Sequence, residues 1–253
     1  MIASILTVKR TEYLSPHYLR VTLTGDDVKE YKDLTVGVNN KIFLPAEDGE
    51  IYFDPGKSIR RTYTHRGIDL DKNEMIIDFV AHGDSGPASA WVIKALPGDK
   101  LGVAMKDANL KLYPQADWYL LVADATGIPV VASILESLPP TAKGIAFIEV
   151  LNKKEEIPLE TAADIQINWI HHDTPGSDSP LAAAVRTEAL PDKSRTNVFG
   201  YVAAEFTTVK EVRSYLRNER GWEKENLHAY AYWKHGKSED GSVQERRDEK
   251  QSL

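Results

Sequence analysis

The chain has 253 residues, a formal net charge of −7, 42% hydrophobic residues and 27% charged residues. This composition is typical of a soluble globular protein long enough for two cores, and the acidic balance disfavours a nucleic-acid partner. The sequence has no cysteine, which excludes disulfides, cysteine nucleophiles and thiolate-bound iron–sulfur clusters. It shows neither a secretory signal nor an apolar run near the roughly 20 residues that cross a bilayer, so we expect a cytoplasmic protein without a membrane partner.

Short β-prone runs separated by turn residues fill the first part of the chain. Such a series predicts a small antiparallel barrel. A single helix interrupts it at 87–95, where proline begins the helix and Pro-Gly-Asp follows its end. The six expected strands are 2–8, 18–24, 41–44, 60–66, 75–81 and 101–104.

The second part alternates apolar strands with helices, which indicates a parallel sheet covered on both faces. The expected strands are 118–123, 144–151, 165–170, 198–203 and 227–233, and the expected helices are 129–138, 181–190 and 209–219. We therefore predict a β-barrel domain at 1–115 and an α/β domain at 116–236, with a break near 113–117. The charged segment 237–253 has no core pattern and is predicted to be a mobile tail.

Two segments of the barrel carry groups that could bind a flavin nucleotide. In Arg61-Thr62-Tyr63-Thr64, strand alternation places Arg61 and Tyr63 on one face, where a guanidinium suits diphosphate oxygens and a phenol can stack on a ring. In the Gly-rich turn before the helix, Gly86 permits close backbone approach and the first helical turn favours a diphosphate. Taken alone, an ordinary solvated strand and a capped helix explain these segments equally simply.

Two strand ends in the α/β part are candidate nucleotide contacts. The turn at 124–129 contains one glycine, so it does not form a G-x-G-x-x-G fingerprint and fits a plain strand–helix turn as well. Glu205 could meet a nicotinamide or ribose, or could simply favour the start of the next helix. His171 and His172 do not predict a metal site, because adjacent strand residues point in opposite directions.

The spaced combination of these motifs resembles the siderophore-interacting proteins, which are FAD-containing ferric-siderophore reductases of bacteria with a ferredoxin-NADP-reductase-like fold. The strongest matches are R-T-Y-T-H-R at 61–66, D-F-V-A-H-G-D-S-G-P-A-S-A-W at 78–91 and P-G-D-K-L at 97–101. Supporting matches are D-A-T-G-I-P at 124–129, V-R-S-Y-L-R-N-E-R-G at 212–221 and A-Y-W-K-H-G at 231–236.

The resemblance implies roles for particular residues. FAD contacts would come from Arg61, Tyr63, Thr64, His82, Gly86, Ala88 and Ser89, and nicotinamide-nucleotide contacts from Thr126 and Glu205. A basic cluster would bind the ferric siderophore through Lys41 and Lys106. Its third member is one of His228, Lys234 and Lys237, of which we select Lys234.

The resemblance also implies a reaction in which electrons pass from NADH, NADPH or a ferredoxin through FAD to chelated ferric iron. A flavin accepts a hydride and releases electrons singly, and the siderophore's hard oxygen ligands hold ferrous iron less well than ferric iron. Where family members read A-G-E, this chain reads Ala203-Ala204-Glu205, and the choice of donor stays open. We expect a monomer. The alternatives are a general ferredoxin-reductase-like flavin reductase and a non-catalytic flavin- or siderophore-binding protein.

Overall fold

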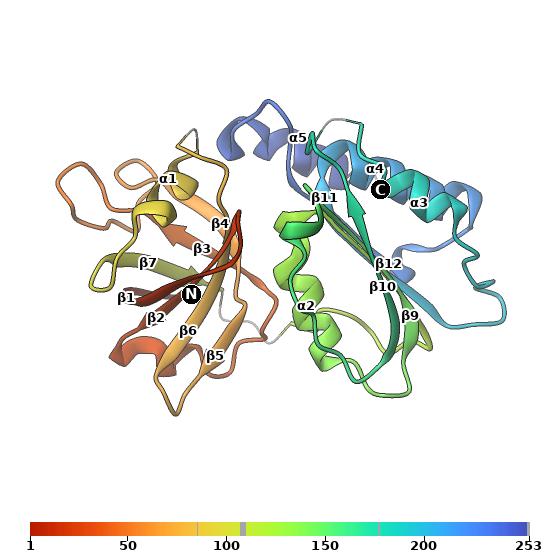
Figure 1. Ribbon diagram of the computed structural model, residues 1–253, viewed down its shortest axis with the longest axis horizontal. Helices are drawn as coiled ribbons and strands as arrows, with labels where there is room; N and C mark the ends of the chain where they lie inside the picture. Colours follow the sequence, from red (N-terminus) through yellow and green to blue (C-terminus); the bar gives the residue numbers. More distant parts are fainter. Residues whose placement is uncertain (85, 107–109, 177, 252–253) are drawn as a thin grey trace. The chain divides into compact units, whose positions relative to one another are not determined.

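The computed structural model describes residues 1–84, 86–106, 110–176 and 178–251 and divides the chain into two compact units, Met1–Leu112 and Tyr113–Leu253 (Figure 1). The first unit is an antiparallel β-structure and the second an α/β structure, which confirms the predicted fold class. The division lies next to the break predicted near 113–117.

The first unit is a seven-stranded antiparallel sheet with the order β4-β3-β7-β1-β2-β6-β5. The sheet curls on itself because β4 continues along the chain into β5, which pairs with β6, and the Arg66 amide donates to the Ile76 carbonyl at 3.0 Å. The strands are β1 (Ile2–Ser15), β2 (Tyr18–Thr24), β3 (Asn39–Phe43), β4 (Arg60–Thr64), β5 (Gly67–Asp69), β6 (Glu74–Val80) and β7 (Lys100–Met105).

Apolar side chains from alternate strand positions fill the interior of this barrel. Ile77 and Phe79 of β6 and Val103 of β7 are fully buried there. The 3₁₀ helix Asp26–Tyr31 also inserts Tyr31, whose hydroxyl donates to the Val103 carbonyl at 2.9 Å. Each such side chain contributes about 1.5–3 kcal/mol on burial. The barrel is a packed core, so a bound group must lie against its outside or its ends.

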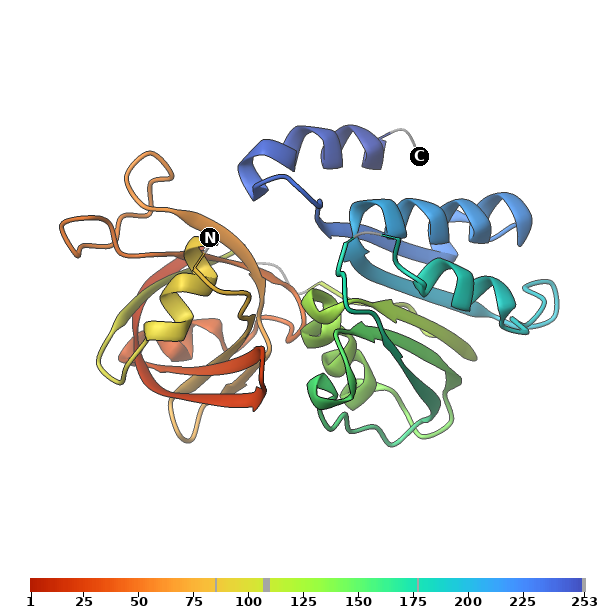
Figure 2. The same ribbon diagram turned by 45° about the horizontal axis from the view of Figure 1, so that its top comes forward.

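The second unit is a five-stranded parallel sheet with the order β10-β9-β8-β11-β12. Its strands are β8 (Trp118–Ala123), β9 (Lys143–Val150), β10 (Asp164–His171), β11 (Val198–Glu205) and β12 (Leu227–Trp233). Helix α2 (Ile128–Ser137) covers one face, and α3 (Leu181–Thr187) and α4 (Phe206–Ser214) cover the other (Figures 1 and 2). The strand order reverses between β8 and β11, and the carboxyl edge at such a reversal is where open α/β sheets bind ligands.

The one glycine in the turn between β8 and α2 is required by packing. A Cβ at Gly127 would lie 2.2 Å from the carbonyl oxygen of Ala203, a separation that no side chain can accept. Residue 127 must therefore lack a side chain for the turn to rest against β11, whatever binds nearby.

The C-terminal segment contains helix α5 (Glu239–Gln251), an element that the sequence analysis did not predict. The segment is rich in Glu, Gln, Lys and Arg, which favour helix without supplying an apolar face. The Glu245 carboxylate accepts hydrogen bonds from Lys234 and, at 2.9 Å, from Lys237. The mobility of the segment stays a prediction. Within the described parts of the chain, no helix combines the length and apolarity needed to cross a membrane.

Candidate functional site

Strand β4 presents two different faces, as its alternation predicts. Arg61 lies opposite Ile42 and Tyr63 opposite Asn40, so both share the side of the sheet that carries the fully buried Ile42. Thr62 lies on the other side, opposite Lys41. The Tyr63 ring packs against the barrel core with its centroid 4.3 Å from that of Phe79.

The turn from β6 into α1 (Pro87–Lys94) is held by a buried serine. The His82 amide donates to the Ser89 hydroxyl at 2.8 Å, and that hydroxyl donates to the Gly83 carbonyl at 2.7 Å. Ser89 is only 2% exposed, so its side chain shapes the turn and its backbone is the part that could face a ligand. A Cβ at Gly86 would lie 2.6 Å from the ring of the exposed His82, so any larger residue there would have to displace that ring.

Helix α1 begins without a side-chain cap. Its N-cap is Gly86, which has no side chain to accept a hydrogen bond, and no capping side chain is found among the described residues. The first-turn amides of a helix have no acceptor within the helix and favour an anion. Ala88, like Ser89, is buried, so these two residues would contact a phosphate through their backbone.

An aromatic row connects the two barrel motifs. The Phe79 centroid lies 5.9 Å from that of Trp91 on α1, and the Tyr63 ring lies on β4 beside the same phenylalanine. This row links β4, which carries Arg61 and Tyr63, to helix α1. Arg61 donates to the Arg60 carbonyl at 2.7 Å, and a guanidinium carries five donors. This set of donors and rings fits the diphosphate and ring system of FAD.

The two predicted siderophore lysines of the first unit lie on and just beyond the strands next to β4. Lys41 lies opposite both Thr62 and Ala104, and its ammonium donates to the Thr62 hydroxyl. Lys41 therefore lies on the sheet face opposite Arg61 and Tyr63. Lys106 is exposed and follows the last residue of β7 directly.

The nucleotide candidates of the second unit are engaged in internal hydrogen bonds. The Asp124 carboxylate accepts from the Thr126 amide at 2.8 Å, from the Thr126 hydroxyl, and from the Trp233 indole nitrogen at 2.7 Å. Burial raises the pKa of Asp124. Thr126 is consequently tied to its own turn.

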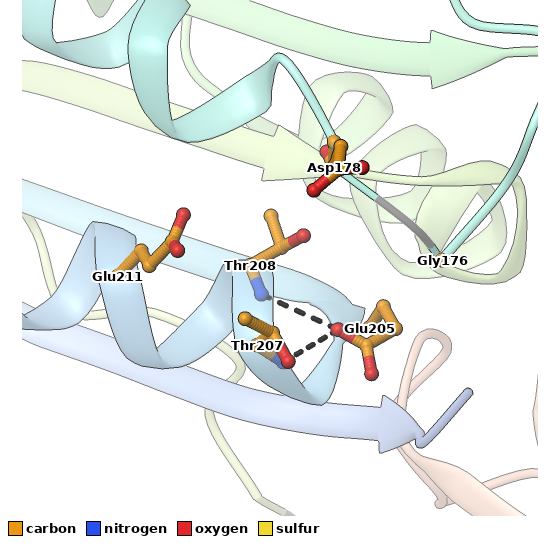
Figure 3. Close-up of a pocket in the computed structure, with 7 residues that line it drawn as sticks. Gly176, Asp178, Glu205, Thr207, Thr208 and Glu211 are labelled. Atoms are coloured by element: carbon orange, nitrogen blue, oxygen red, sulfur yellow. Dashed lines mark hydrogen bonds between the residues drawn. The ribbon is translucent and has the colours of Figure 1, made fainter. Parts of the chain in front are cut away.

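Glu205 has a similar internal role at the start of α4. Its carboxylate accepts from the amides of Thr207 and Thr208, as Figure 3 shows, and also from the His235 amide at 3.1 Å. Only 4% of Glu205 is exposed. The carboxylate occupies the end of α4 where a dinucleotide fold would place a phosphate.

Lys234 is also held internally. Its ammonium lies 4.4 Å from the centre of the Phe206 ring and donates to Glu245 of α5. This pairing neutralises the lysine selected as the third siderophore contact. That role stays a prediction.

Sequence reasoning did not identify two buried polar residues at the end of the barrel. His65 and Asn40 are almost fully buried, and within the described residues their side-chain nitrogen and oxygen atoms have no hydrogen-bond partner. Burial lowers the pKa of His65 to about 4. Asn40 lies in β3 and His65 directly follows β4, and polar residues that interrupt the apolar alternation are a signal that could have revealed them.

Known protein families match both units. The siderophore-interacting FAD-binding domain matches residues 7–108, and the siderophore-interacting protein family matches residues 116–236. The ferric vibriobactin reductase ViuB of Vibrio cholerae is 31% identical to this chain over 96% of it and 93% of ViuB. The mycobactin import ATP-binding/permease protein IrtA of Mycobacterium tuberculosis is 25% identical, covering 92% of this chain and 26% of IrtA.

Solved structures agree with these matches. A siderophore utilization protein from T. fusca is 30% identical with a TM-score of 0.85, covering 94% of each chain. The siderophore-interacting protein SipS from Aeromonas hydrophila is 26% identical with a TM-score of 0.87, covering 98% of each chain. A Neisseria gonorrhoeae ferredoxin NADP+ reductase is 10% identical over 89% of this chain and 97% of that one, with a TM-score of 0.62, and supports the fold alone. The chain belongs to the siderophore-interacting protein family, and its first unit is that family's FAD-binding domain.

Proposed function

We propose that this protein is an FAD-dependent ferric-siderophore reductase that acts as a cytoplasmic monomer. The observation that carries the proposal is the packing of Tyr63 and Trp91 against Phe79, which links the strand that carries Arg61 to helix α1. Identity of 31% to a ferric vibriobactin reductase over nearly the whole chain supports the same reaction.

In this scheme the chain's own residues bind and orient the FAD and the ferric siderophore. The Arg61 guanidinium and the first-turn amides of α1 bind the FAD diphosphate, and Tyr63 packs against the ring system. The flavin, when bound, takes up electrons in pairs and passes them on singly. The lysine ammonium groups of Lys41 and Lys106 attract an anionic ferric chelate to a chain whose net charge is −7.

The electron donor in this scheme is a nicotinamide nucleotide, and a ferredoxin is the alternative. A parallel sheet whose order reverses between β8 and β11 supports the nucleotide, since ligands bind at this edge. No metal ligand set is needed, because the siderophore holds the iron.

The test is direct. The purified protein is loaded with FAD, reduced without oxygen, and mixed with a ferric siderophore in the presence of a ferrous-specific chelating dye. We expect one FAD per chain and ferrous dye formation that saturates with siderophore concentration. A protein that binds FAD but forms no ferrous dye after chemical reduction would be a binding protein, and the proposal would fail.

A further inference from the structure

A polar pocket opens at the carboxyl edge of the second unit's sheet. Its volume is about 230 Å³. The end of β11, the first turns of α4 and the loop between β10 and α3 enclose it, and Figure 3 shows carboxylates entering from all three. The lining residues are Gly176, Asp178, Ser179, Glu205, Thr207, Thr208 and Glu211.

This pocket carries negative charge and no positive charge. Asp178, Glu205 and Glu211 contribute carboxylates, and the described lining contains neither lysine nor arginine. Glu205 is committed to the start of α4. Asp178 and Glu211 are exposed. Among the described residues neither side-chain carboxylate makes a hydrogen bond or ion pair, so both carboxylates are available to a ligand.

The start of α4 offers no phosphate site of the usual kind. In dinucleotide folds the pyrophosphate lies at a helix N-terminus and is bound by backbone amides. Here Glu205 accepts from the first amides of α4, whereas α2 begins at Gly127 without a side-chain cap among the described residues. A phosphate group at the start of α4 would have to displace a carboxylate of the protein itself.

A protein carboxylate at a ribose site distinguishes a ribose with free hydroxyls from one that carries a 2′-phosphate. A carboxylate accepts hydrogen bonds from the 2′- and 3′-hydroxyls of an unmodified adenosine ribose, whereas a 2′-phosphate in the same place meets like charge. Serine and threonine hydroxyls in the same lining can bind a ribose hydroxyl in either direction. The pocket therefore fits the ribose of NADH and opposes that of NADPH.

We propose that this protein takes its electrons from NADH in preference to NADPH, and that Asp178 and Glu211 exclude the 2′-phosphate. The inference rests on the proposed function, in which a nicotinamide nucleotide is the donor. It adds the preference of that site for NADH over NADPH and names the two residues that cause the preference.

The first measurement is the rate of flavin bleaching by NADH and NADPH without oxygen, compared at equal donor concentrations below saturation. We expect the wild type to favour NADH by about tenfold or more, because juxtaposed like charges are costly at a partly enclosed site. The double variant Asp178→Asn/Glu211→Gln keeps the shape of the side chains and removes both charges. It should raise the rate of flavin bleaching by NADPH several-fold. Asparagine is chosen because residue 178 has a φ of 52°, which asparagine tolerates.

Equilibrium binding gives a second readout that needs no electron transfer. Titration calorimetry on the FAD-loaded protein with ADP-ribose and with 2′-phospho-ADP-ribose should show tighter binding of ADP-ribose, and a smaller difference in the double variant. Glu225→Gln, an exposed glutamate outside the pocket, is the matched control and should keep the wild-type ratio. The single variant Glu211→Gln repeats the test if the double variant does not fold.

Equal use of both nucleotides, a preference for NADPH, or an unchanged ratio in a folded variant would overturn the proposal. So would a flavin that neither nucleotide bleaches. Reducing the flavin chemically, without a nucleotide, tests the proposed function separately from the NADH preference. If the reduced protein still releases ferrous iron from a ferric siderophore, the reductase proposal stands without an NADH site. If NADH bleaches the flavin selectively and no ferrous iron appears, the pocket inference stands and the reductase proposal fails.

Discussion

His65 is expected to make the first unit sensitive to acid. Its imidazole is fully buried directly after β4, and burial lowers its pKa from 6.5 to about 4. The folded protein therefore keeps this ring neutral over a pH range in which the unfolded chain protonates it. Because the unfolded state binds more protons there, the free energy of unfolding falls as the pH drops from 6.5 towards 4.

The magnitude follows from the two pKa values. A difference of about 2.5 between 6.5 and about 4 corresponds to about 3 kcal/mol, at 1.36 kcal/mol for each unit, of which about 2 kcal/mol is lost between pH 7.5 and 5. His65→Val removes the titrating group and supplies a side chain that suits an extended backbone. The free energy of unfolding of the variant should therefore lack this part of its pH dependence. The variant should also be more stable at pH 7.5, since it no longer buries two ring nitrogens without partners.

The assay is urea unfolding of the wild type and the variant at a series of pH values from 7.5 to 5, with FAD in fixed excess. The comparison uses the difference between the two proteins, which cancels contributions from carboxylates and FAD that both share. His17→Asn, which changes an exposed histidine in the same unit, should follow the wild type. Parallel curves for the wild type and His65→Val, with both proteins folded, would refute the reasoning and show that His65 titrates normally.

Three further outcomes are expected. Arg61→Ala should weaken FAD binding by roughly 10- to 150-fold, since a hydrogen bond to a charged group contributes about 1.5–3 kcal/mol, and flavin fluorescence in a dialysis series measures this loss; unchanged affinity would remove Arg61 from the site. Lys41→Ala and Lys106→Ala should keep full FAD content and weaken reduction of an anionic ferric siderophore at low salt, with a smaller effect at high salt and for a neutral chelate. The exposed Lys29→Ala is their control, and identical concentration dependence in all three would contradict this position for the substrate. Limited proteolysis should cut within 237–253 before any site in the FAD-loaded core, and the reverse order would show that α5 is firmly held.

The barrel and the parallel sheet could be predicted because both depend on local patterns. Alternating apolar residues and turn signals mark the barrel strands, and the register shows Arg61 and Tyr63 sharing a face as expected. Strand spacing cannot show which face looks inward. Only the pairing of Arg61 with the buried Ile42 reveals that Lys41 lies on the opposite side.

Sequence reasoning could not identify hydrogen-bond partners that come from distant segments of the chain. The indole of Trp233 reaches Asp124 across 109 positions of the chain, and no local pattern connects them. For the same reason the sequence could not show that the His235 amide donates to the Glu205 carboxylate, and the nucleotide contact of Glu205 stays a prediction. Helix α5 was missed because a segment without an apolar face carries no periodic signal.

The N-terminal ends of α1 and α4 differ in how their first amides are satisfied. Among the described residues, Gly86 leaves α1 without a side-chain cap, whereas the Glu205 carboxylate caps the start of α4. An uncapped start gains most from a phosphate that stays in place, because its amides otherwise rely on water. A start that is satisfied by its own carboxylate loses nothing when a ligand leaves. This contrast is the one expected when FAD remains bound to the first unit and the electron donor visits the second unit only for the transfer.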